Sequence, residues 1–398
     1  MKVLHINYYE KKGGASIATQ QIHSALLNKK IESKIFVAEK ETNDENIISE
    51  SNFFSFISFK FRERFNRNLF KILNLKSANT QSSGLLRSYL PYKINKMNFD
   101  IVNLHWINNE MMSIKDLKRI RKPLVWTLHD LWPISGKDHY SNEKNNKRSL
   151  FDKFIFDQKK KNWQNLFKVI CPSNWIYKKA KASEIMRNND IRLIPHPIDA
   201  KKWERLRNKN EIKRLFNLEF DEDHKVLLFG AERASKNKRK GYHIVLETVR
   251  KISEKKKIIL LIFGNEKKGV EKINQNLIII NVGYIVDRHS LLRALYSLSD
   301  IMLVPSLEEA FGLTAAEASA TGTPVVTLEG TGTEDIILNN FNGIVSNENS
   351  FVNDVSNLIN SKEKLEEFSI NGVTHINDNF NPEKISNLYL KLYEEILN

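Results

Sequence analysis

Short apolar runs alternate with longer amphipathic stretches along the chain. In the first half, the runs predicted to be strands are Val3–Asn7, Lys34–Val37, Ile101–Trp106, Leu124–His129, Val169–Pro172 and Ile191–Ile194. Segments with helical periodicity separate them, which is the rhythm of repeated βαβ units. Because the runs are rich in Val, Ile and Leu on both faces, they predict a parallel sheet covered by helices on both sides.

The same rhythm begins again after a polar stretch at Lys201–Lys213. The later runs are Val226–Phe229, Ile258–Phe263, Leu277–Val282, Ile301–Val304 and Pro324–Thr327. We therefore predict two α/β domains, residues 1–198 and 199–380, and a terminal helical segment, residues 381–398. Open parallel sheets bind ligands beyond the C-terminal ends of their strands, so we expect the functional residues in the loops that follow these strands.

Composition agrees with a globular protein of this size. The chain has 398 residues, of which 41% are hydrophobic, enough for two cores. Its single cysteine, Cys171, excludes an internal disulfide framework and is expected at a buried strand end. The N-terminal apolar run is too short for a signal peptide, and no later run reaches the length of a membrane span. These features favour a cytoplasmic protein.

The net charge of +15 indicates anionic partners without naming them. Between Phe53 and Lys76, phenylalanines alternate with Lys and Arg, a pattern typical of a helix on a membrane surface. The alternative is that most of these phenylalanines close the N-terminal core while the cations face water. No nucleic-acid partner is expected, because the basic residues lack an RNP signature, zinc-finger spacing or helix-turn-helix pattern.

A glycine pair follows the first predicted strand, in the segment Lys11-Lys12-Gly13-Gly14-Ala15-Ser16. Gly13 and Gly14 can bring backbone amides against a phosphate at the N-terminus of the next helix, where the helix dipole also favours an anion. A plain strand-to-helix turn would have the same appearance. The segment lacks the G-x-G-x-x-G spacing of nicotinamide enzymes, which makes that class less favoured.

The most specific motif lies after the predicted strand Ile301–Val304. It reads P-S-L-E-E-A-F-G-L-T-A-A-E-A from Pro305 and is followed by G-T-P-V-V from Gly322. This segment resembles the signature of family 4 glycosyltransferases, in which two glutamates, here Glu309 and Glu317, flank a Phe-Gly pair. The glutamate spacing alone would mean little, but the surrounding Pro, Phe and Gly positions make the resemblance specific.

The resemblance implies roles for these residues. Glu309 would lie on the loop after a strand and contact the donor sugar, and Glu317 would lie on the next helix and contact the nucleotide ribose. Phe311, Gly312 and Leu313, between the two glutamates, are expected to help bind the donor. The alternative for Glu317 is a solvated carboxylate on the helix surface.

Cations follow the first strand of the second domain. Arg233 and the pair Lys240-Gly241 are similar to the family's arginine and lysine-glycine pair, which bind the donor phosphates. Cations at such a position can neutralise a leaving diphosphate. Lys240 matches the family pattern well. Arg233 matches less closely, because the loop after it is long and Ala231 aligns equally well, so a solvated loop arginine stays an alternative.

A string of His and Trp residues ends strands of the first domain. Val125–Pro133 reads V-W-T-L-H-D-L-W-P and resembles a bacterial branch of the same family that builds exopolysaccharide and O-antigen chains. The resemblance places His129 at the family's cleft histidine, a catalytic candidate together with Glu309 and Lys240. His105, Trp106, Asp130 and Trp132 are candidates for the acceptor side, and a satisfied structural histidine is the alternative for His129.

The resemblance runs through nearly the whole chain. It implies the GT-B architecture, two Rossmann-like domains whose parallel sheets face each other across a cleft, with the last helix crossing back to the N-terminal domain. It also implies a retaining, metal-independent transfer from a nucleotide-diphosphate sugar, UDP- or GDP-linked, with no cofactor.

The acceptor implied is a saccharide, which we expect to be lipid-linked at the anionic inner face of the plasma membrane and used in cell-surface polysaccharide synthesis. Two other functions stay open. A nucleotide-sugar epimerase of GT-B fold would act on the donor without an acceptor, and a non-catalytic nucleotide-sugar binder would not turn it over.

Overall fold

The computed structural model describes residues 1–49, 53–75, 80–141, 148–285 and 287–398, without the side chains of residues 53–56. The chain divides into two compact units. Residues Met1–Pro197 together with Pro382–Asn398 form the N-terminal domain, and Ile198–Asn381 form the C-terminal domain. The terminal helical segment thus belongs to the N-terminal domain.

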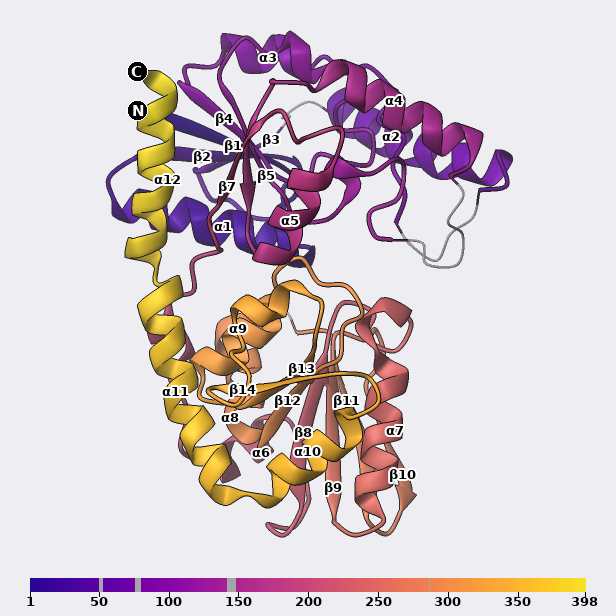
Figure 1. Cartoon of the computed structure of the whole chain (residues 1–398), viewed down its shortest axis with the longest axis vertical. Coiled ribbons are helices and arrows are strands. Elements are labelled where there is room, and N and C mark those ends of the chain that lie inside the picture. Colours follow the sequence, from indigo (N-terminus) through magenta and orange to yellow (C-terminus); the bar gives the residue numbers. More distant parts are fainter. Residues whose placement is uncertain (50–52, 76–79, 142–147, 286) are drawn as a thin grey trace. The chain divides into compact units, whose positions relative to one another are not determined.

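The N-terminal domain is built on a parallel sheet of order β3-β2-β1-β4-β5-β6-β7 (Figure 1). The register aligns His5 of β1 with Asn103 of β4, and Val125 of β5 with Asn103 on the other side. The sheet therefore brings the polar side chains of His5 and Asn103 side by side. Its strands are β1 (Lys2–Tyr9), β2 (Glu32–Glu39), β3 (Ile47–Ser49), β4 (Ile101–Leu104), β5 (Leu124–Thr127), β6 (Lys168–Cys171) and β7 (Asp190–Leu193).

Helices pack on this sheet. One face is covered by α1 (Gly13–Asn28) and α12 (Pro382–Leu397), which contact each other and lie crosswise in Figure 1. Val3, Ile101 and Val125 form one buried cluster with Leu26 of α1 and Tyr389 of α12. The other elements are α2 (Phe53–Ile72), α3 (Leu90–Lys96), α4 (Leu150–Asn162), α5 (Asn174–Ala182), and the 3₁₀ turns η1 (Leu117–Arg119) and η2 (Trp132–Ile134).

The face of the sheet under α12 changes from apolar to polar along the strands. Side chains alternate between faces, so His5 follows Val3 on that face, Asn103 follows Ile101 and Thr127 follows Val125. Asn103 donates to the Tyr393 hydroxyl of α12 (2.9 Å) and accepts from Thr127 (3.1 Å). The apolar layer anchors α12, and the polar layer leads toward the C-terminal ends of the strands.

The C-terminal domain has a second sheet of order β10-β11-β9-β8-β12-β13-β14, parallel except for β10. Its strands are β8 (Lys225–Gly230), β9 (Ile258–Phe263), β10 (Gly269–Asn274), β11 (Leu277–Gly283), β12 (Ile301–Val304), β13 (Val325–Leu328) and β14 (Gly343–Ser346). The central strands β8, β9 and β12 are buried along almost their whole length. This burial explains their continuous apolar sequences.

Each face of this sheet carries its own core. On one face, α8 (Arg293–Leu298), α9 (Leu313–Ala320) and α11 (Lys362–Phe380) pack over the sheet, and on the other, α7 (Tyr242–Ser253) and α10 (Phe351–Asn360) do so (Figure 1). The remaining elements are α6 (Lys209–Leu215), the π-helical turn η5 (Arg288–Leu292), and the 3₁₀ turns η3 (Ala200–Trp203), η4 (Lys238–Lys240) and η6 (Gly332–Asp335).

The predicted fold class of two parallel-sheet α/β domains is confirmed. Each predicted apolar run overlaps a strand, although Trp106 and His129 lie just beyond β4 and β5 rather than within them. Cys171 ends β6 and is buried, as expected. The strands not predicted are β3, β10 and β14, at the sheet edges. Over the parts of the chain that the structure describes, no helix combines the length and hydropathy needed to cross a bilayer.

Candidate active site

The C-terminal domain brings Lys240 and Glu309 together. Lys240 ends the short turn η4, which follows β8, and Glu309 lies on the loop after β12. The Lys240 ammonium donates to Oε2 of Glu309, which also accepts from the Ser306 hydroxyl (3.4 Å). Both side chains are mostly buried, with 18% and 14% of their surfaces exposed. Residues 69 apart in sequence thus form one charged pair at the C-terminal edge of the sheet.

Gly241 permits this approach. Its backbone has φ of +73°, and a Cβ added there would lie 1.9 Å from the Pro305 carbonyl oxygen. Only glycine fits at this position without strain. The two loops are further joined by the Leu307 amide, which donates to the Arg239 carbonyl (2.8 Å). The glycine after Lys240 therefore has a steric reason, because only a residue without Cβ lets the η4 turn contact the loop that carries Glu309.

The pair has a defined electrostatic state. Burial opposes ionisation of Glu309, yet the charges of Lys240 and Arg239 lower the pKa of its carboxyl group below the ordinary value. Burial lowers the pKa of Lys240, an effect that Glu309 opposes. At neutral pH the site holds a carboxylate that can accept hydrogen bonds from hydroxyls. It also holds the Lys240 ammonium, which has three N–H donors and can donate to an anionic ligand as well as to Glu309.

Arg239 is a site residue that the sequence interpretation missed. It donates to the Glu308 carbonyl, and its charge acts on Glu309. Arg233, the arginine expected at the donor phosphates, is exposed, has φ of +53° and donates its backbone amide to the Gly264 carbonyl (2.8 Å). The position of Arg239 beside Lys240 in the R-K-G sequence is a signal that could have identified it.

Glu317 lies on α9 and is wholly buried, so the alternative of a solvated surface carboxylate is wrong. Arg288 donates from one Nη to both carboxylate oxygens (2.6 and 2.7 Å), and the Tyr296 hydroxyl donates to Oε2 (3.1 Å). Nothing in the sequence spacing pairs Arg288 with Glu317. The carboxylate that we expected at the ribose is held by an arginine and a tyrosine.

The residues between the two glutamates shape the loop. Gly312 precedes α9 with φ of +100°, and a Cβ there would lie 2.6 Å from the Thr333 methyl carbon. Phe311 is buried, with its ring centroid 5.9 Å from that of Phe380. Leu313 packs, partly buried, against the same core. The Phe and Leu side chains thus anchor the loop in the domain core, and Gly312 supplies the turn into the helix.

In the N-terminal domain, the Gly13-Gly14 pair begins α1. Gly13 has φ of +80°, and the N-cap residue Lys12 makes no side-chain capping bond. The Ser16 hydroxyl donates to the carbonyls of Tyr9 (2.9 Å) and Lys12 (2.7 Å), which fixes the turn. The first amides of a helix lack intrahelical acceptors, so this turn can bind an anion.

His129 belongs to a chain of histidines. Its Nε2 lies 2.9 Å from Nδ1 of His105, and Nε2 of His105 lies 2.9 Å from Nδ1 of His5 in β1. The His196 ring stacks on His129 with centroids 5.1 Å apart. Burial lowers the pKa of His129 to about 4, although Asp130 opposes the shift, and burial also lowers the pKa values of His5 and His105. All three imidazoles are therefore neutral at pH 7.

The remaining candidates form a buried network. Asp130 accepts from His139 Nδ1 (2.5 Å), from the Trp106 indole (3.0 Å) and from the Trp132 amide (3.0 Å). The Trp132 ring is 1% exposed and donates to the Ser82 carbonyl (2.9 Å). Trp132 was expected to be available to an acceptor, but it lies in the domain core. Trp106 is half-buried and stacks on Tyr9, with ring centroids 5.8 Å apart.

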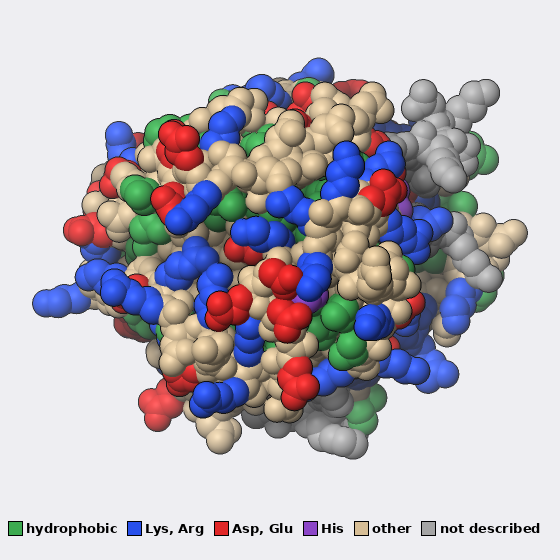
Figure 2. Space-filling view, turned by 90° about the horizontal axis from the view of Figure 1, so that it is seen from below, with side chains coloured by type: hydrophobic (Ala, Val, Ile, Leu, Met, Phe, Trp, Pro, Cys, Tyr) green, Lys and Arg blue, Asp and Glu red, His purple; other side chains and the backbone are tan. Residues whose placement is uncertain are grey.

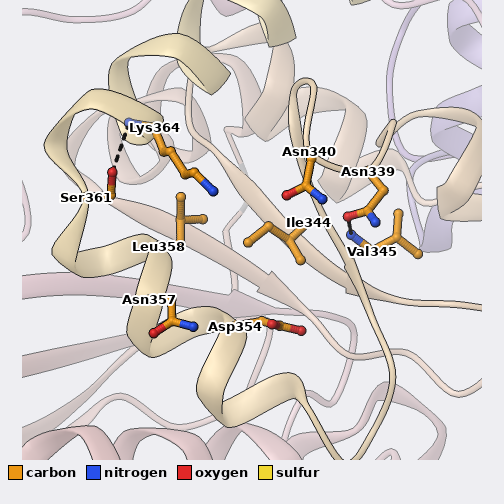
Figure 3. Close-up of a pocket in the computed structure, with 9 residues that line it drawn as sticks. All are labelled: Asn339, Asn340, Ile344, Val345, Asp354, Asn357, Leu358, Ser361 and Lys364. Carbon is orange, nitrogen blue, oxygen red and sulfur yellow. Dashed lines mark hydrogen bonds between the residues drawn. The ribbon is translucent and has the colours of Figure 1, made fainter.

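Two other features lie apart from these residues. A polar hollow of about 250 Å³ is lined by Asn339, Asp354 and Lys364, among others, from the region of β14, α10 and α11 (Figure 3). Within the described ranges, the acidic and histidine groups close enough to hold a metal ion are Asp221, Asp223 and His224. They precede β8, at the strand end opposite Lys240, and Asp223 pairs with Lys257 (2.7 Å).

Each of the two domains matches a known protein family. Residues 12–202 match the family described as Glycosyltransferase Family 4, and residues 211–375 match the one described as Glycosyl transferases group 1. An Escherichia coli protein named O-antigen biosynthesis glycosyltransferase WclY is 25% identical over 82% of this chain and 80% of its own. A Klebsiella pneumoniae protein, named uncharacterized 41.2 kDa protein in cps region, is 24% identical over 99% of each chain.

Solved structures share the fold at lower identity. Sucrose-phosphate synthase from Thermosynechococcus elongatus superposes with a TM-score of 0.74 and 16% identity, covering 99% of this chain and 98% of its own. Anabaena Alr3699/HepE, in complex with UDP-glucose, superposes with a TM-score of 0.64 and 15% identity, covering 99% and 100%. These likenesses establish the two-domain fold.

Proposed function

The chain belongs to the family 4 glycosyltransferases of GT-B fold, and from this premise we propose that it transfers a sugar, with retention of configuration, from a nucleotide-diphosphate sugar to a saccharide acceptor. The observation that carries the proposal is the Lys240–Glu309 pair. It sets the Lys240 ammonium beside the buried Glu309 carboxylate. A cation can bind a diphosphate, and a carboxylate can accept hydrogen bonds from sugar hydroxyls.

We propose the following roles. Lys240 and Arg239 neutralise the charge that develops on the diphosphate as the bond from the sugar C1 to the phosphate oxygen breaks. Glu309 accepts hydrogen bonds from sugar hydroxyls, and Glu317, held by Arg288, positions the ribose. His129 contacts the donor sugar, and the amides of Gly13 and Gly14 supply further donors to the diphosphate.

The bond changes balance without a protein nucleophile. The acceptor oxygen bonds to C1 on the face that the diphosphate leaves, and the acceptor proton passes to an oxygen of that diphosphate. The state of Glu309 favours this route, because a carboxylate paired with Lys240 is a poor nucleophile. As written, the reaction needs neither metal ion nor cofactor.

We propose a UDP- or GDP-linked donor and a lipid-linked saccharide acceptor at the cytoplasmic face of the membrane. The HepE structure contains UDP-glucose, which supports a uridine nucleotide. The WclY relative is named for O-antigen synthesis and the Klebsiella relative for its cps region, which supports a role in cell-surface polysaccharide synthesis. Helix α2, which exposes Phe61 beside Arg64, supports contact with an anionic membrane.

Thermal unfolding with a panel of UDP-, GDP-, ADP- and CMP-sugars tests the donor site, because a ligand that binds the native state raises its stability. We expect one diphosphate sugar to raise the Tm, and Lys240→Ala and Glu309→Gln to remove most of that increase. Lys238→Ala is the matched control, since Lys238 is an exposed lysine in the same η4 turn. An equal loss with Lys238→Ala, or no loss with Lys240→Ala, would contradict the assignment.

The two alternative functions predict different products. An epimerase would convert the donor to another sugar nucleotide with no acceptor present. A non-catalytic binder would show the Tm increase and never release nucleoside diphosphate. Either result would replace the transferase proposal.

A further inference from the structure

We infer that His5 and His105 act as positioning residues that fix the tautomer of His129, so that His129 presents a protonated Nδ1 to its ligand. This inference deepens the proposed function and rests on it for the identity of that ligand, a sugar of the donor or acceptor. It concerns a hydrogen-bonded relay of imidazoles, His5–His105–His129, that runs from inside the sheet to the strand ends.

The first step is the geometry of the relay. Each link joins Nδ1 of one ring to Nε2 of the next, at 2.9 Å in both cases. Backbone hydrogen bonds hold the members in place. His5 lies within β1, and the His105 amide donates to the Ile6 carbonyl (2.9 Å) while the His105 carbonyl accepts from the Trp126 indole (3.0 Å). These contacts fix the backbone positions of His5 and His105, from which the linked rings extend.

The second step is the protonation state. His5 and His105 are 0% and 3% exposed, so each ring stays neutral and carries one N–H and one lone pair. A chain of neutral imidazoles can run in only two directions. Either every Nδ1–H donates outward toward His129, or every Nε2–H donates inward toward His5.

The inner end of the relay decides between these directions. Nε2 of His5 is buried and has no hydrogen-bond partner among the residues described. If the relay ran inward, this atom would carry a buried N–H with no acceptor, and buried orphan donors are rare and costly. If the relay runs outward, the same atom holds only a lone pair. The outward direction is therefore the more stable one.

The consequence lies at His129. Its Nε2 accepts from His105, which leaves the proton of the half-buried ring on Nδ1. The stacked His196 ring restricts the rotation of the His129 ring. His129 is thereby prepared to donate a hydrogen bond to a hydroxyl or phosphate oxygen and cannot take a proton at Nδ1. This agrees with a reaction in which the proton of the acceptor hydroxyl passes to the leaving diphosphate and not to His129.

The test is nitrogen NMR of the full-length, ligand-free protein labelled with ¹⁵N in its histidine rings, at pH 7.5. The His129 signals are assigned from their absence in His129→Asn. We expect a single tautomer of His129 protonated at Nδ1 in the wild type, and a mixture or the opposite tautomer in His105→Leu, which removes the donor to His129 Nε2. His105→Asn should restore the wild-type pattern, because the Asn Nδ2–H can replace the donor at His105 Nδ1.

His23→Asn is the matched control. His23 is a buried neighbour, with its ring centroid 6.3 Å from that of His5, but its Nδ1 contacts Ser33 (2.7 Å) outside the relay. It should leave the His129 tautomer unchanged. A wild-type His129 that is protonated at Nε2 or doubly protonated overturns the inference, as does an unchanged tautomer in a folded His105→Leu variant.

The result separates this inference from the proposed function. The tautomer is read without any substrate. A protein with the expected His129 tautomer that turns over no nucleotide sugar contradicts the proposed function alone, whereas an active protein with the wrong tautomer contradicts the relay alone.

Discussion

At the scale of single residues, the candidate site places ionised groups where burial opposes their charge. Glu309 stays ionised because Lys240 and Arg239 face it, and the Glu317 carboxyl group is paired with Arg288. The sequence predicted both glutamates and Lys240 because the family motif fixes their spacing. It did not predict Arg288, because this residue lies on η5 and reaches Glu317 of α9 only in the folded chain. The histidine relay was not predicted because its links depend on the order of the strands.

The first residue-scale prediction concerns Gly241. Gly241→Ala places a Cβ 1.9 Å from the Pro305 carbonyl oxygen, at a backbone conformation that side chains rarely adopt. We expect a loss of roughly 2 kcal/mol or more in the free energy of unfolding, measured by urea denaturation, because the η4 turn must move away. Donor-induced stabilisation should fall as well, because Lys240 moves with that turn.

Gly269→Ala is the control for this variant. Gly269 lies in the exposed edge strand β10, and an added Cβ meets nothing within 4 Å. Its substitution should change the free energy of unfolding by less than about 0.5 kcal/mol. Equal effects of the two substitutions would mean that the contact between the η4 turn and Pro305 does not matter.

The second residue-scale prediction concerns pH. Burial lowers the pKa values of His23 and His129 to about 4, against 6.5 in the unfolded chain, although Asp44 opposes the shift at His23 and Asp130 at His129. Between these pH values the unfolded chain binds more protons than the folded one. The free energy of unfolding should therefore be constant above about pH 6.5 and fall as the pH decreases toward 4.

Urea midpoints measured between pH 7.5 and 4.5 check this expectation. His23→Asn should remove part of the slope, up to about 3 kcal/mol over the full range. His243→Asn, at an exposed position on α7, should leave the slope as it is. A midpoint that does not change with pH in the wild type would show that the buried histidines titrate alike in both states.

At the scale of elements, the sequence predicted the central strands and missed the edge strands β3, β10 and β14. The central strands are apolar on both faces, so their sequences differ sharply from the surrounding helices. Strand β10 is exposed along nearly its whole length and β3 has only three residues, so neither carries an apolar signal. Edge strands form through pairing with a neighbour, which local sequence does not encode. The contacts of α12 likewise depend on the tertiary fold.

Helix α2 fits both interpretations of the basic aromatic stretch, because some of its apolar side chains close the N-terminal core and others are exposed. Phe59 and Phe70 are buried, whereas Ile57, Phe61 and Ile72 are exposed. The exposed apolar positions recur at spacings of one helical turn or its multiples and thus share a stripe. Lys76 and the side chains of Phe54 and Phe56 lie outside the described residues.

The cations of α2 also divide into two kinds. Arg62 is half-buried and donates to the carbonyls of Glu110 (2.5 Å), Arg87 (2.7 Å) and Leu86, so it serves the fold. Arg64 and Arg67 are exposed near Phe61. A test of membrane contact should therefore change Arg64 and Arg67 and retain Arg62.

We predict that the protein binds vesicles of phosphatidylglycerol and phosphatidylcholine, and binds pure phosphatidylcholine vesicles more weakly. In co-sedimentation at low salt, Arg64→Glu with Arg67→Glu should reduce binding to the anionic vesicles by about tenfold or more, because each cation near the surface contributes about 1 kcal/mol. Lys255→Glu with Lys267→Glu makes the same change in charge in the C-terminal domain and should have little effect. Equal effects of the two pairs would indicate non-specific attraction.

At the scale of the whole molecule, net charge says less than its distribution. On the face shown in Figure 2, cations and carboxylates are interspersed rather than gathered into one basic patch. The charge of +15 is therefore no guide to function by itself. The assignment to the glycosyltransferases rests instead on the two domains, each of which matches a glycosyltransferase family.

The most direct measurement is the release of nucleoside diphosphate by the purified full chain, with its donor and with or without a saccharide acceptor. We predict release that depends on the acceptor, a product whose new glycosidic bond has the anomeric configuration of the donor, and a loss of at least about a hundredfold in Glu309→Gln. Conversion of the donor without an acceptor, an inverted product, or undiminished transfer by Glu309→Gln would contradict a retaining glycosyltransferase organised around the Lys240–Glu309 pair.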